Sequence, residues 1–211
     1  MIPLEAIKNF FPAALRDNAL ASKHLLKEYI QLMILDYLSS TPYIRKLTFI
    51  GGTCIRLTKA IDRFSEDLDF DIKALSQEEF TKMTDDVIKF LQNNGLHALA
   101  KDRLNPKLKA FRRNIHFPEL LFDLGLSGHK EERFLIKIES QDQLVHYQSD
   151  MINIKGGGFY FPMPVPSDAV LCAMKVSAML DRKKGRDFYD AMFLLSQTMP
   201  DSKQNFYSNF T

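Results

Sequence analysis

The stretch Asp67-Leu68-Asp69-Phe70-Asp71-Ile72 decides the fold class, because it alternates strictly between carboxylate and apolar side chains. This alternation is typical of a β-strand with one buried and one exposed face. All three aspartates then project from one face, with neighbouring Cα atoms about 7 Å apart. Like charges at this spacing repel and Asp is disfavoured in strands, so a structural role requires a fully solvated edge. The pattern therefore favours a divalent cation such as Mg²⁺, bound through Asp67 and Asp69.

A second acidic strand is expected to complete this site, because a pair of metal ions usually needs a carboxylate from a neighbouring strand. The run Phe134-Leu135-Ile136-Lys137-Ile138-Glu139 has a strand pattern that ends in an acidic side chain, so Glu139 is the candidate. Asp123 is its rival for this position. Asp71 is placed below the other two aspartates, since exposure to solvent explains its charge more simply.

The turn Gly51-Gly52-Thr53 is expected to form the phosphate side of the same site. It follows the β-prone run Leu47-Thr48-Phe49-Ile50 and precedes a short helix from about Thr53 to Ala60. Glycines let a backbone approach a ligand closely, and amides at the start of a helix are oriented toward an anion. Two glycines after a strand also form ordinary turns, and GGTCIRLTK lacks the G-x-x-x-x-G-K-[ST] spacing of a Walker loop.

The segments around these motifs predict an α+β fold. Apolar residues at helical spacing place two scaffold helices in the first 40 residues. Residues 76–94 are predicted to form an amphipathic helix, with Ser76 as N-cap, Glu79 as its capping-box partner and Gly95 as the stop. Four later runs have strand character and together predict a mixed sheet of five or more strands: 97–103, 109–117, 119–124 and 133–140.

A change in composition near residue 160 divides the chain in this prediction. From Gly156 to Pro166 the sequence is rich in turn residues, and Ser167-Asp168 can cap a helix. The predicted units are a core with N-terminal helices over residues 1–160 and a helical segment packed on it over residues 161–211. The two helices expected in that segment are 168–183 and 186–197, with Gly185 between them.

The first of these C-terminal helices carries a lysine in an apolar setting. An unpaired buried ammonium at Lys175 would be costly, although its stem can also snorkel to water. In a continuous helix Arg182 and Arg186 lie seven and eleven residues further on, close to whole turns, so all three can face one anion. Asp187 can cap the last helix, and Asp190 can pair with a neighbouring arginine.

Length and composition bound the function classes. The 211 residues suffice for one compact unit, and no apolar stretch approaches the roughly 20 residues of a membrane span. The N-terminus lacks a secretion-signal pattern, which predicts a cytoplasmic protein. Cys54 and Cys172 stand in unlike contexts and are expected to be reduced and buried. The net charge of +2 identifies no polyanionic partner, but Lys101 to Arg113 and Lys175 to Arg186 are basic and form either solvated faces or an RNA surface.

Three motifs follow one another along the chain: Ile50-Gly51-Gly52-Thr53 with Arg56-Leu57, then Arg63-Phe64-Ser65-Glu66-Asp67-Leu68-Asp69-Phe70, then Lys175 with Arg182-Lys183-Lys184-Gly185-Arg186-Asp187-Phe188-Tyr189-Asp190. Together they resemble the AbiEii/AbiGii toxin family. Its members are nucleotidyltransferase-fold toxins of bacterial type IV toxin–antitoxin and phage-defence systems. The resemblance covers about Ile50 to Leu195. Many relatives continue after the third motif with a further helical region. In this chain, substrate recognition by that region is therefore expected to be reduced or done differently.

The resemblance implies a nucleotidyltransferase fold, with a mixed sheet and flanking helices, that binds an NTP with two Mg²⁺ ions. By position, Asp67, Asp69 and Glu139 would bind the metals. The residues expected at the nucleotide are Gly51, Gly52, Thr53, Arg56, Lys175, Arg182, Arg186, Asp187 and Asp190, the last two as rivals for the family's C-terminal acidic position.

The reaction implied is transfer of NMP from the NTP to an acceptor hydroxyl, which in studied relatives is the 3′ end of tRNA. The catalytic set would be Asp67, Asp69, Glu139 and Lys175, with Glu139 taking the hydroxyl proton. The resemblance also predicts an antitoxin, a winged-helix regulator encoded upstream. Two alternatives are transfer to a small molecule or a protein, and a non-catalytic module that binds an NTP or a partner.

Overall fold

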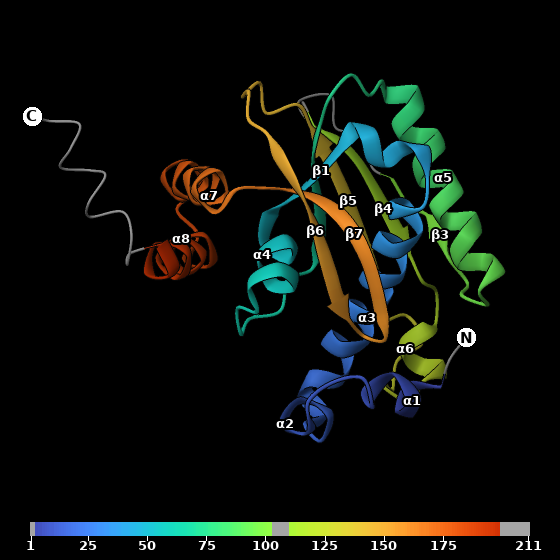
Figure 1. Cartoon of the computed structure of the whole chain (residues 1–211). Coiled ribbons are helices and arrows are strands. Elements are labelled where there is room, and N and C mark those ends of the chain that lie inside the picture. The colour runs from blue at the N-terminus through green and yellow to red at the C-terminus, as the bar shows by residue number, and fades with distance from the viewer. Residues whose placement is uncertain (1–2, 103–109, 199–211) are drawn as a thin grey trace, which may run out of the picture.

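A five-stranded sheet lies at the centre of the computed structural model, which describes residues 3–102 and 110–198 (Figure 1). The strands are, in spatial order, β1 (Leu47–Ile50), β2 (Asp67–Ile72), β5 (Leu135–Gln141), β4 (Phe111–His116) and β3 (Leu99–Ala100). β2 and β5 are parallel, and the other neighbouring pairs are antiparallel. The predicted α+β class and mixed sheet are therefore confirmed.

Two long helices supply much of the core. The helices are α1 (Leu4–Lys8), α2 (Ala13–Arg16), α3 (Ser22–Ser39), α4 (Gly51–Lys59), α5 (Gln77–Asn93), α6 (Leu120–Asp123), α7 (Asp168–Arg182) and α8 (Gly185–Thr198). α3 buries Leu25, Leu32 and Leu35 completely and is covered on most sides, since the polar Glu28 and Gln31 are buried as well. α5 begins with the predicted capping box, in which the Ser76 hydroxyl accepts from the Glu79 amide and the Glu79 carboxylate accepts from the Ser76 amide.

A β-hairpin replaces the turn-rich segment predicted at 156–166. β6 (Ser149–Gly156) pairs with β7 (Phe159–Pro166), and β7 packs against α3 and β1. The prolines at 162, 164 and 166 suggested turns, but alternate residues of a strand point their N–H groups to the same side. Within residues 3–102 and 110–198, β7 pairs with β6 alone, so the missing donors can all lie on its other edge. The division of the chain near residue 160 stays a prediction, and β7 favours placing it after Pro166.

Two of the shorter strand predictions also need correction. Residues 119–124 form the helix α6 instead of a strand, because the adjacent Leu120 and Leu121 are both buried and Glu119 takes a left-handed conformation with φ 57°. Asp123 is exposed on this helix, away from the β2–β5 strands, so it is no longer a rival of Glu139. The strand predicted over 97–103 shortens to β3, and part of it lies outside the described residues.

α7 and α8 pack against each other beside the sheet, at the left of Figure 1, after the chain leaves β7. Both helices were predicted from the sequence, and Gly185 begins α8. Cys54 and Cys172 are buried free thiols, as predicted. Among the helices of the described ranges, none has both the length and the apolar character needed to cross a membrane.

Candidate active site

Asp69 and Glu139 lie side by side because β2 and β5 are parallel neighbours in register. The pairing sets Asp69 opposite Glu139 and Asp67 opposite Lys137. On the other side of β5, β4 adds Arg112 opposite Glu139. The structure thus brings the two aspartates and the glutamate together from strands about 70 residues apart in the sequence.

Two cations lie among these carboxylates. Lys137 Nζ is 2.8 Å from Asp67 Oδ2 and 3.1 Å from Glu139 Oε1. Arg112 Nε is 2.8 Å from Glu139 Oε1. The two groups form an ion pair, but they are not oriented for a hydrogen bond. Burial alone would lower the pKa of Lys137, but the hydrogen bond to Asp67 and the charges of Asp67 and Glu139 raise it. As the described side chains stand, no three His, Cys, Asp or Glu groups converge closely enough to hold a metal ion.

Asp69 is the unpartnered carboxylate of the site: it makes no hydrogen bond or ion pair with a described residue. Burial, followed by the charges of Asp67 and Glu139, raises the pKa of Asp69 to about 6. Its Oδ2 atom lies so close to Gly51 that a Cβ there would be 2.2 Å away, and Gly51 has φ +83°. Only glycine can occupy this position, because the backbone of the turn lies directly against the Asp69 carboxylate. A partly desolvated charge without a partner suits an added cation.

Asp71 has an environment different from the solvated one predicted. It is fully buried, its Oδ1 atom accepts from the Gln143 amide at 2.9 Å, and its Oδ2 atom accepts from the Tyr147 hydroxyl. Lys73 Nζ lies 3.4 Å from the same carboxylate. Burial and then the hydrogen bond to Asp71 raise the pKa of Tyr147. Asp71 therefore holds the segment after β5 in place, and strand periodicity alone could not distinguish it from Asp69.

The Gly51-Gly52-Thr53 turn begins α4 beside β2, but its three residues do different things. Gly51 and Gly52 line cavities at the carboxylates. A Cβ on Gly52 would lie 2.8 Å from Arg63 Nη2, so the backbone is packed tightly there. Thr53 is 1% exposed, and its hydroxyl donates to the carbonyl oxygen of Asp67. Its side chain thus positions β2 and is not directed into a cavity.

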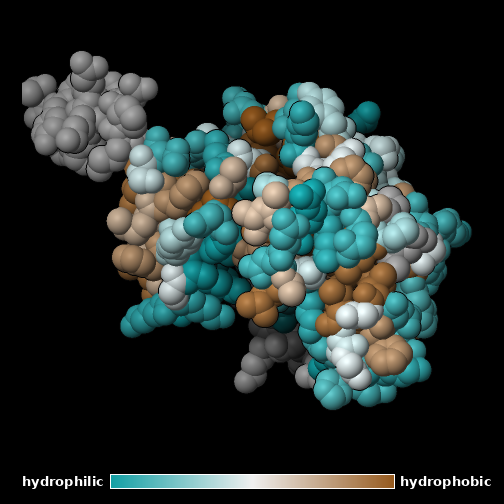
Figure 2. All heavy atoms as spheres, turned by 90° about the horizontal axis from the view of Figure 1, so that it is seen from below, coloured by the Kyte–Doolittle hydropathy of each residue, from teal (hydrophilic) through white to brown (hydrophobic). Residues whose placement is uncertain are grey.

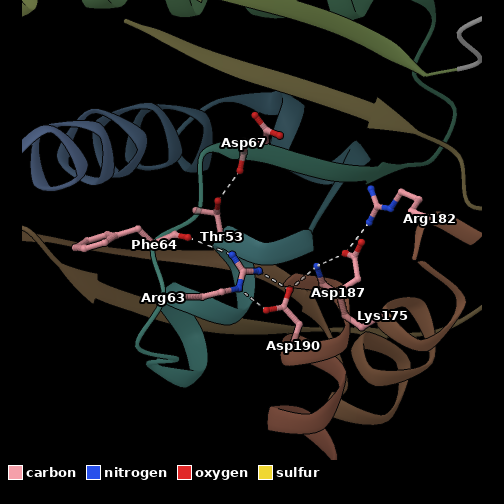
Figure 3. A network of polar contacts seen from close by, with 8 residues as sticks. All are labelled: Thr53, Arg63, Phe64, Asp67, Lys175, Arg182, Asp187 and Asp190. Carbon is pink, nitrogen blue, oxygen red and sulfur yellow. Dashed lines mark hydrogen bonds and ion pairs between the residues drawn. The ribbon is translucent and has the colours of Figure 1, made fainter. Parts of the chain in front are cut away.

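A charged network on α7 and α8 faces this turn (Figure 3). Asp187 and Asp190 are buried, with exposed fractions of 1% and 0%. Lys175 Nζ lies 2.8 Å from Asp190 Oδ2 and 3.8 Å from Asp187 Oδ1. Arg182 Nη2 lies 2.9 Å from Asp187 Oδ1, while Arg63 binds both oxygens of Asp190. Asp187 Oδ2 is buried and has no hydrogen-bond partner among the described residues.

Two adjoining cavities join the carboxylates to this network. The polar cavity, of about 280 Å³, is lined by four carboxylates and seven basic side chains: Asp67, Asp69, Glu139, Asp187, Arg63, Arg112, Lys137, Lys175, Arg182, Lys184 and Arg186. The larger cavity, of about 390 Å³, shares Asp69, Glu139, Lys175 and Arg182 with it and adds apolar residues such as Leu171 and Met174. Figure 2 shows hydrophilic side chains along the recess between the helices at the left and the rest of the molecule. A ligand with a charged part and a flat apolar part would fit this combination.

Residues 34–209 match a protein-family model, the nucleotidyl transferase AbiEii toxin of type IV toxin–antitoxin systems. The chain belongs to this family. As an AbiEii family member it is an enzyme, a nucleotidyltransferase toxin, and membership of this family implies an NTP as substrate and an antitoxin as partner. Among proteins with curated functions, none matches the chain in sequence.

Solved structures show the same fold at low sequence identity. JHP933 from Helicobacter pylori has a TM-score of 0.56 at 21% identity, with 83% of this chain and 67% of that chain covered. MenT4, a nucleotidyltransferase toxin from Mycobacterium tuberculosis H37Rv, has a TM-score of 0.57 at 20% identity, with 84% and 59% covered. A putative nucleotidyltransferase from H. pylori has a TM-score of 0.52 at 20% identity, with 81% and 68% covered. The chain therefore spans less than two thirds of MenT4.

Arg56, like Thr53 and Asp190, is a predicted nucleotide-site residue that lines neither of these two cavities. Its Nε atom lies 2.9 Å from Glu28 Oε2, its Nη1 atom donates to the Ile61 carbonyl, and its guanidinium stacks on Phe64. These contacts tie α4 to α3 and to the segment before β2. Arg186, by contrast, lines the polar cavity from the start of α8. The basic run 101–113 lies partly outside the described residues, and its described members include Arg112 and Arg113.

Four basic residues of the polar cavity were not singled out from the sequence, and one of them, Lys184, appeared only within the third family motif. Lys137 lies two residues before Glu139, so the strand period places both on one face and could have identified it. Arg63 stands inside the second family motif, but no local pattern indicates its partner on α8. Arg112 was noted only as part of a basic run. Its position depends on the pairing of β4 with β5, which the sequence does not specify.

Proposed function

We propose that this AbiEii family member transfers NMP from an NTP to a hydroxyl at the 3′ end of a tRNA, in a reaction that depends on Mg²⁺. The observation that supports this most is the alignment of Asp67, Asp69 and Glu139 beside a cavity lined by seven basic side chains. Carboxylates are the ligands of hard divalent cations, and clustered basic groups bind phosphates. The arrangement matches the two charged parts of a metal-bound NTP.

The three carboxylates fit two Mg²⁺ ions by their donor chemistry. Asp69 is partly buried and unpartnered among the described residues, and its raised pKa reflects a negative charge that a divalent cation would compensate. Asp67 and Glu139 would exchange their contacts with Lys137 for the ions. When bound, such ions polarise the reacting phosphate and lower the pKa of the attacking hydroxyl.

The nucleotide would lie across both cavities. Lys175 and Arg182 border the polar and the larger cavity, so they can contact the triphosphate and stabilise the charge that develops on the departing pyrophosphate. The amides of Gly51 and Gly52 lie at the start of α4 and would approach the same phosphates. Leu171 and Met174 give the larger cavity an apolar wall suited to the nucleoside.

The acceptor hydroxyl must release a proton as it attacks the α-phosphate. Glu139 stays the candidate to take it, and it would first have to exchange Arg112 or Lys137 for the hydroxyl. Lys184 and Arg186 are exposed and line the polar cavity, where they would contact phosphates of an RNA acceptor. In the cell, the proposed setting is the cytoplasm, with a role in phage defence and a winged-helix antitoxin encoded upstream.

A labelling experiment tests this function. Each α-³²P-labelled NTP is incubated with the protein, Mg²⁺ and total tRNA, and the products are separated by size, with Asp67→Ala as the matched inactive variant. Wild type is expected to label tRNA with one preferred nucleotide and to lose the activity in EDTA. Equal background labelling by both proteins would refute transfer to tRNA, whereas label on a small molecule or on protein would replace the acceptor and keep the reaction.

A further inference from the structure

Arg63 stands between the phosphate-facing turn and the helix that carries Asp190. Its Nε atom donates to Asp190 Oδ1 at 2.6 Å, its Nη2 atom donates to Asp190 Oδ2, and its Nη1 atom donates to the Phe64 carbonyl at 3.1 Å. We infer that Arg63 is a positioning residue that engages Asp190 so that the ammonium of Lys175 stays available to the triphosphate. This role rests on the NTP site proposed above.

The argument begins with the sharing of one buried carboxylate by two cations. Asp190 is fully buried, and its Oδ2 atom lies 2.8 Å from Lys175 Nζ as well as within hydrogen-bond distance of Arg63. A buried carboxylate with Lys175 as its sole partner would bind that ammonium strongly, since a desolvated charge requires compensation. Arg63 satisfies both oxygens through its planar fork, which a single ammonium cannot do. Lys175 then keeps part of its charge for a ligand.

The charges of the whole network support the same conclusion. Asp187 and Asp190 are balanced by Lys175, Arg182 and Arg63, which leaves one positive charge in excess. Without Arg63 the two carboxylates would balance Lys175 and Arg182, so the network around Lys175 would have no positive charge in excess. Among the three cations, Arg63 is the one supplied by the core, from the segment before β2.

Arg63 is also held in place from both sides. Its Nη2 atom lies against Gly52, where a Cβ would approach it to 2.8 Å. The neighbouring Asp62 accepts a hydrogen bond from the Tyr189 hydroxyl on α8, and Lys59 Nζ lies 2.6 Å from Asp168 Oδ1 on α7. Residues 59–63 therefore connect the turn to both C-terminal helices, and Arg63 provides the link that reaches Lys175.

Binding of inorganic tripolyphosphate, measured by calorimetry, tests the inference without the nucleobase, the acceptor or turnover. Arg63→Gln is expected to weaken binding about tenfold or more, which corresponds to about 1.4 kcal/mol. Arg63→Lys keeps the charge but not the fork, so it should still lose about threefold to fivefold. Arg45→Gln, which removes an exposed arginine from the 3-10 turn before β1, is the matched control and should bind like wild type. Thermal melts confirm that each variant is folded.

Coupling to Asp190 separates positioning from direct phosphate contact. In an Asp190→Asn background the carboxylate no longer competes for Lys175, so most of the effect of Arg63→Gln should disappear. An equal effect in both backgrounds would overturn the inference, as would tight binding by Arg63→Gln, wild-type binding by Arg63→Lys, or failure of the wild-type protein to bind tripolyphosphate. Should tRNA labelling fail while these binding effects hold, the proposed acceptor would be wrong and the role of Arg63 would stand.

Discussion

Two groups of charged residues line the polar cavity: the carboxylate cluster on β2 and β5, and the charged network on α7 and α8. Their net charges have opposite signs. In the cluster, Asp67, Asp69 and Glu139 face Lys137 and Arg112, so one negative charge is in excess. In the network, two buried aspartates face three cations, so one positive charge is in excess. The first is suited to a cation and the second to an anion, as the two parts of a metal-bound NTP require.

The two regions also differ in how their carboxylates are satisfied. Asp69 is unpartnered among the described residues, which makes its charge unfavourable in the folded state. Asp190 is bound by Arg63 and Lys175, which makes its charge part of what holds the helices to the core. Neutralising a carboxylate should therefore have opposite effects on stability in the two regions, and this contrast can be tested directly.

The largest expected effect is the loss of activity in Asp69→Asn. Nucleotidyl transfer should fall on the order of 10³-fold, about 4 kcal/mol, because a metal-binding carboxylate contributes charge stabilisation in the transition state. Steady-state labelling of the acceptor measures this loss. Activity within about threefold of wild type would exclude Asp69 from the metal site.

The same variant tests the stability side of the contrast through pH. The pKa of Asp69 is raised to about 6, so the folded state binds more protons than the unfolded state between about pH 4 and pH 6. Ionisation then destabilises the wild-type protein progressively as the pH rises through that window. Measured in EDTA, Asp69→Asn should melt above wild type at pH 8, and its advantage should shrink as the pH falls from 6 toward 4. A lower melting temperature at pH 8 would contradict the raised pKa.

Asp190→Asn should act in the opposite direction. Replacing one member of a buried charge network leaves Arg63 and Lys175 without their shared partner, which costs about 3 kcal/mol of folding free energy. Denaturant unfolding at pH 8 measures the change, and Asp181→Asn, at an exposed position of α7, serves as the control. An Asp190→Asn protein as stable as wild type would remove the distinction drawn between the two regions.

The smallest effect is expected outside both regions, at Arg56. Arg56→Gln should lower the free energy of unfolding by about 1.5 kcal/mol, because it removes a charge-assisted hydrogen bond to the buried Glu28. The KM for the NTP should stay within about twofold of wild type, since Arg56 does not line either cavity. A KM raised tenfold with unchanged stability would return Arg56 to the nucleotide site.

Local patterns in the sequence were sufficient for the elements whose signals are contained in short stretches. The alternation of residues 67–72 predicted β2, the Ser76 and Glu79 pair predicted the start of α5, and apolar spacing with Gly185 predicted α7 and α8. These signals depend on one strand period, one helix turn or one cap, so residues close in sequence are enough to predict each element. The β6–β7 hairpin escaped detection because its prolines act as breakers in a paired strand and are tolerated only at the edge it forms.

The sequence by itself determined the mixed α+β fold, the family, and the carboxylates and lysine proposed for catalysis, because these are properties of residue type and spacing. Tertiary structure decided which of those residues face a cavity. It buried Asp71 under Tyr147, turned Thr53 and Arg56 toward the scaffold, and placed Lys137, Arg112 and Arg63 at the site. Periodicity fixes the face of a strand on which a side chain lies, but only packing against distant segments fixes whether that face is covered, paired or open.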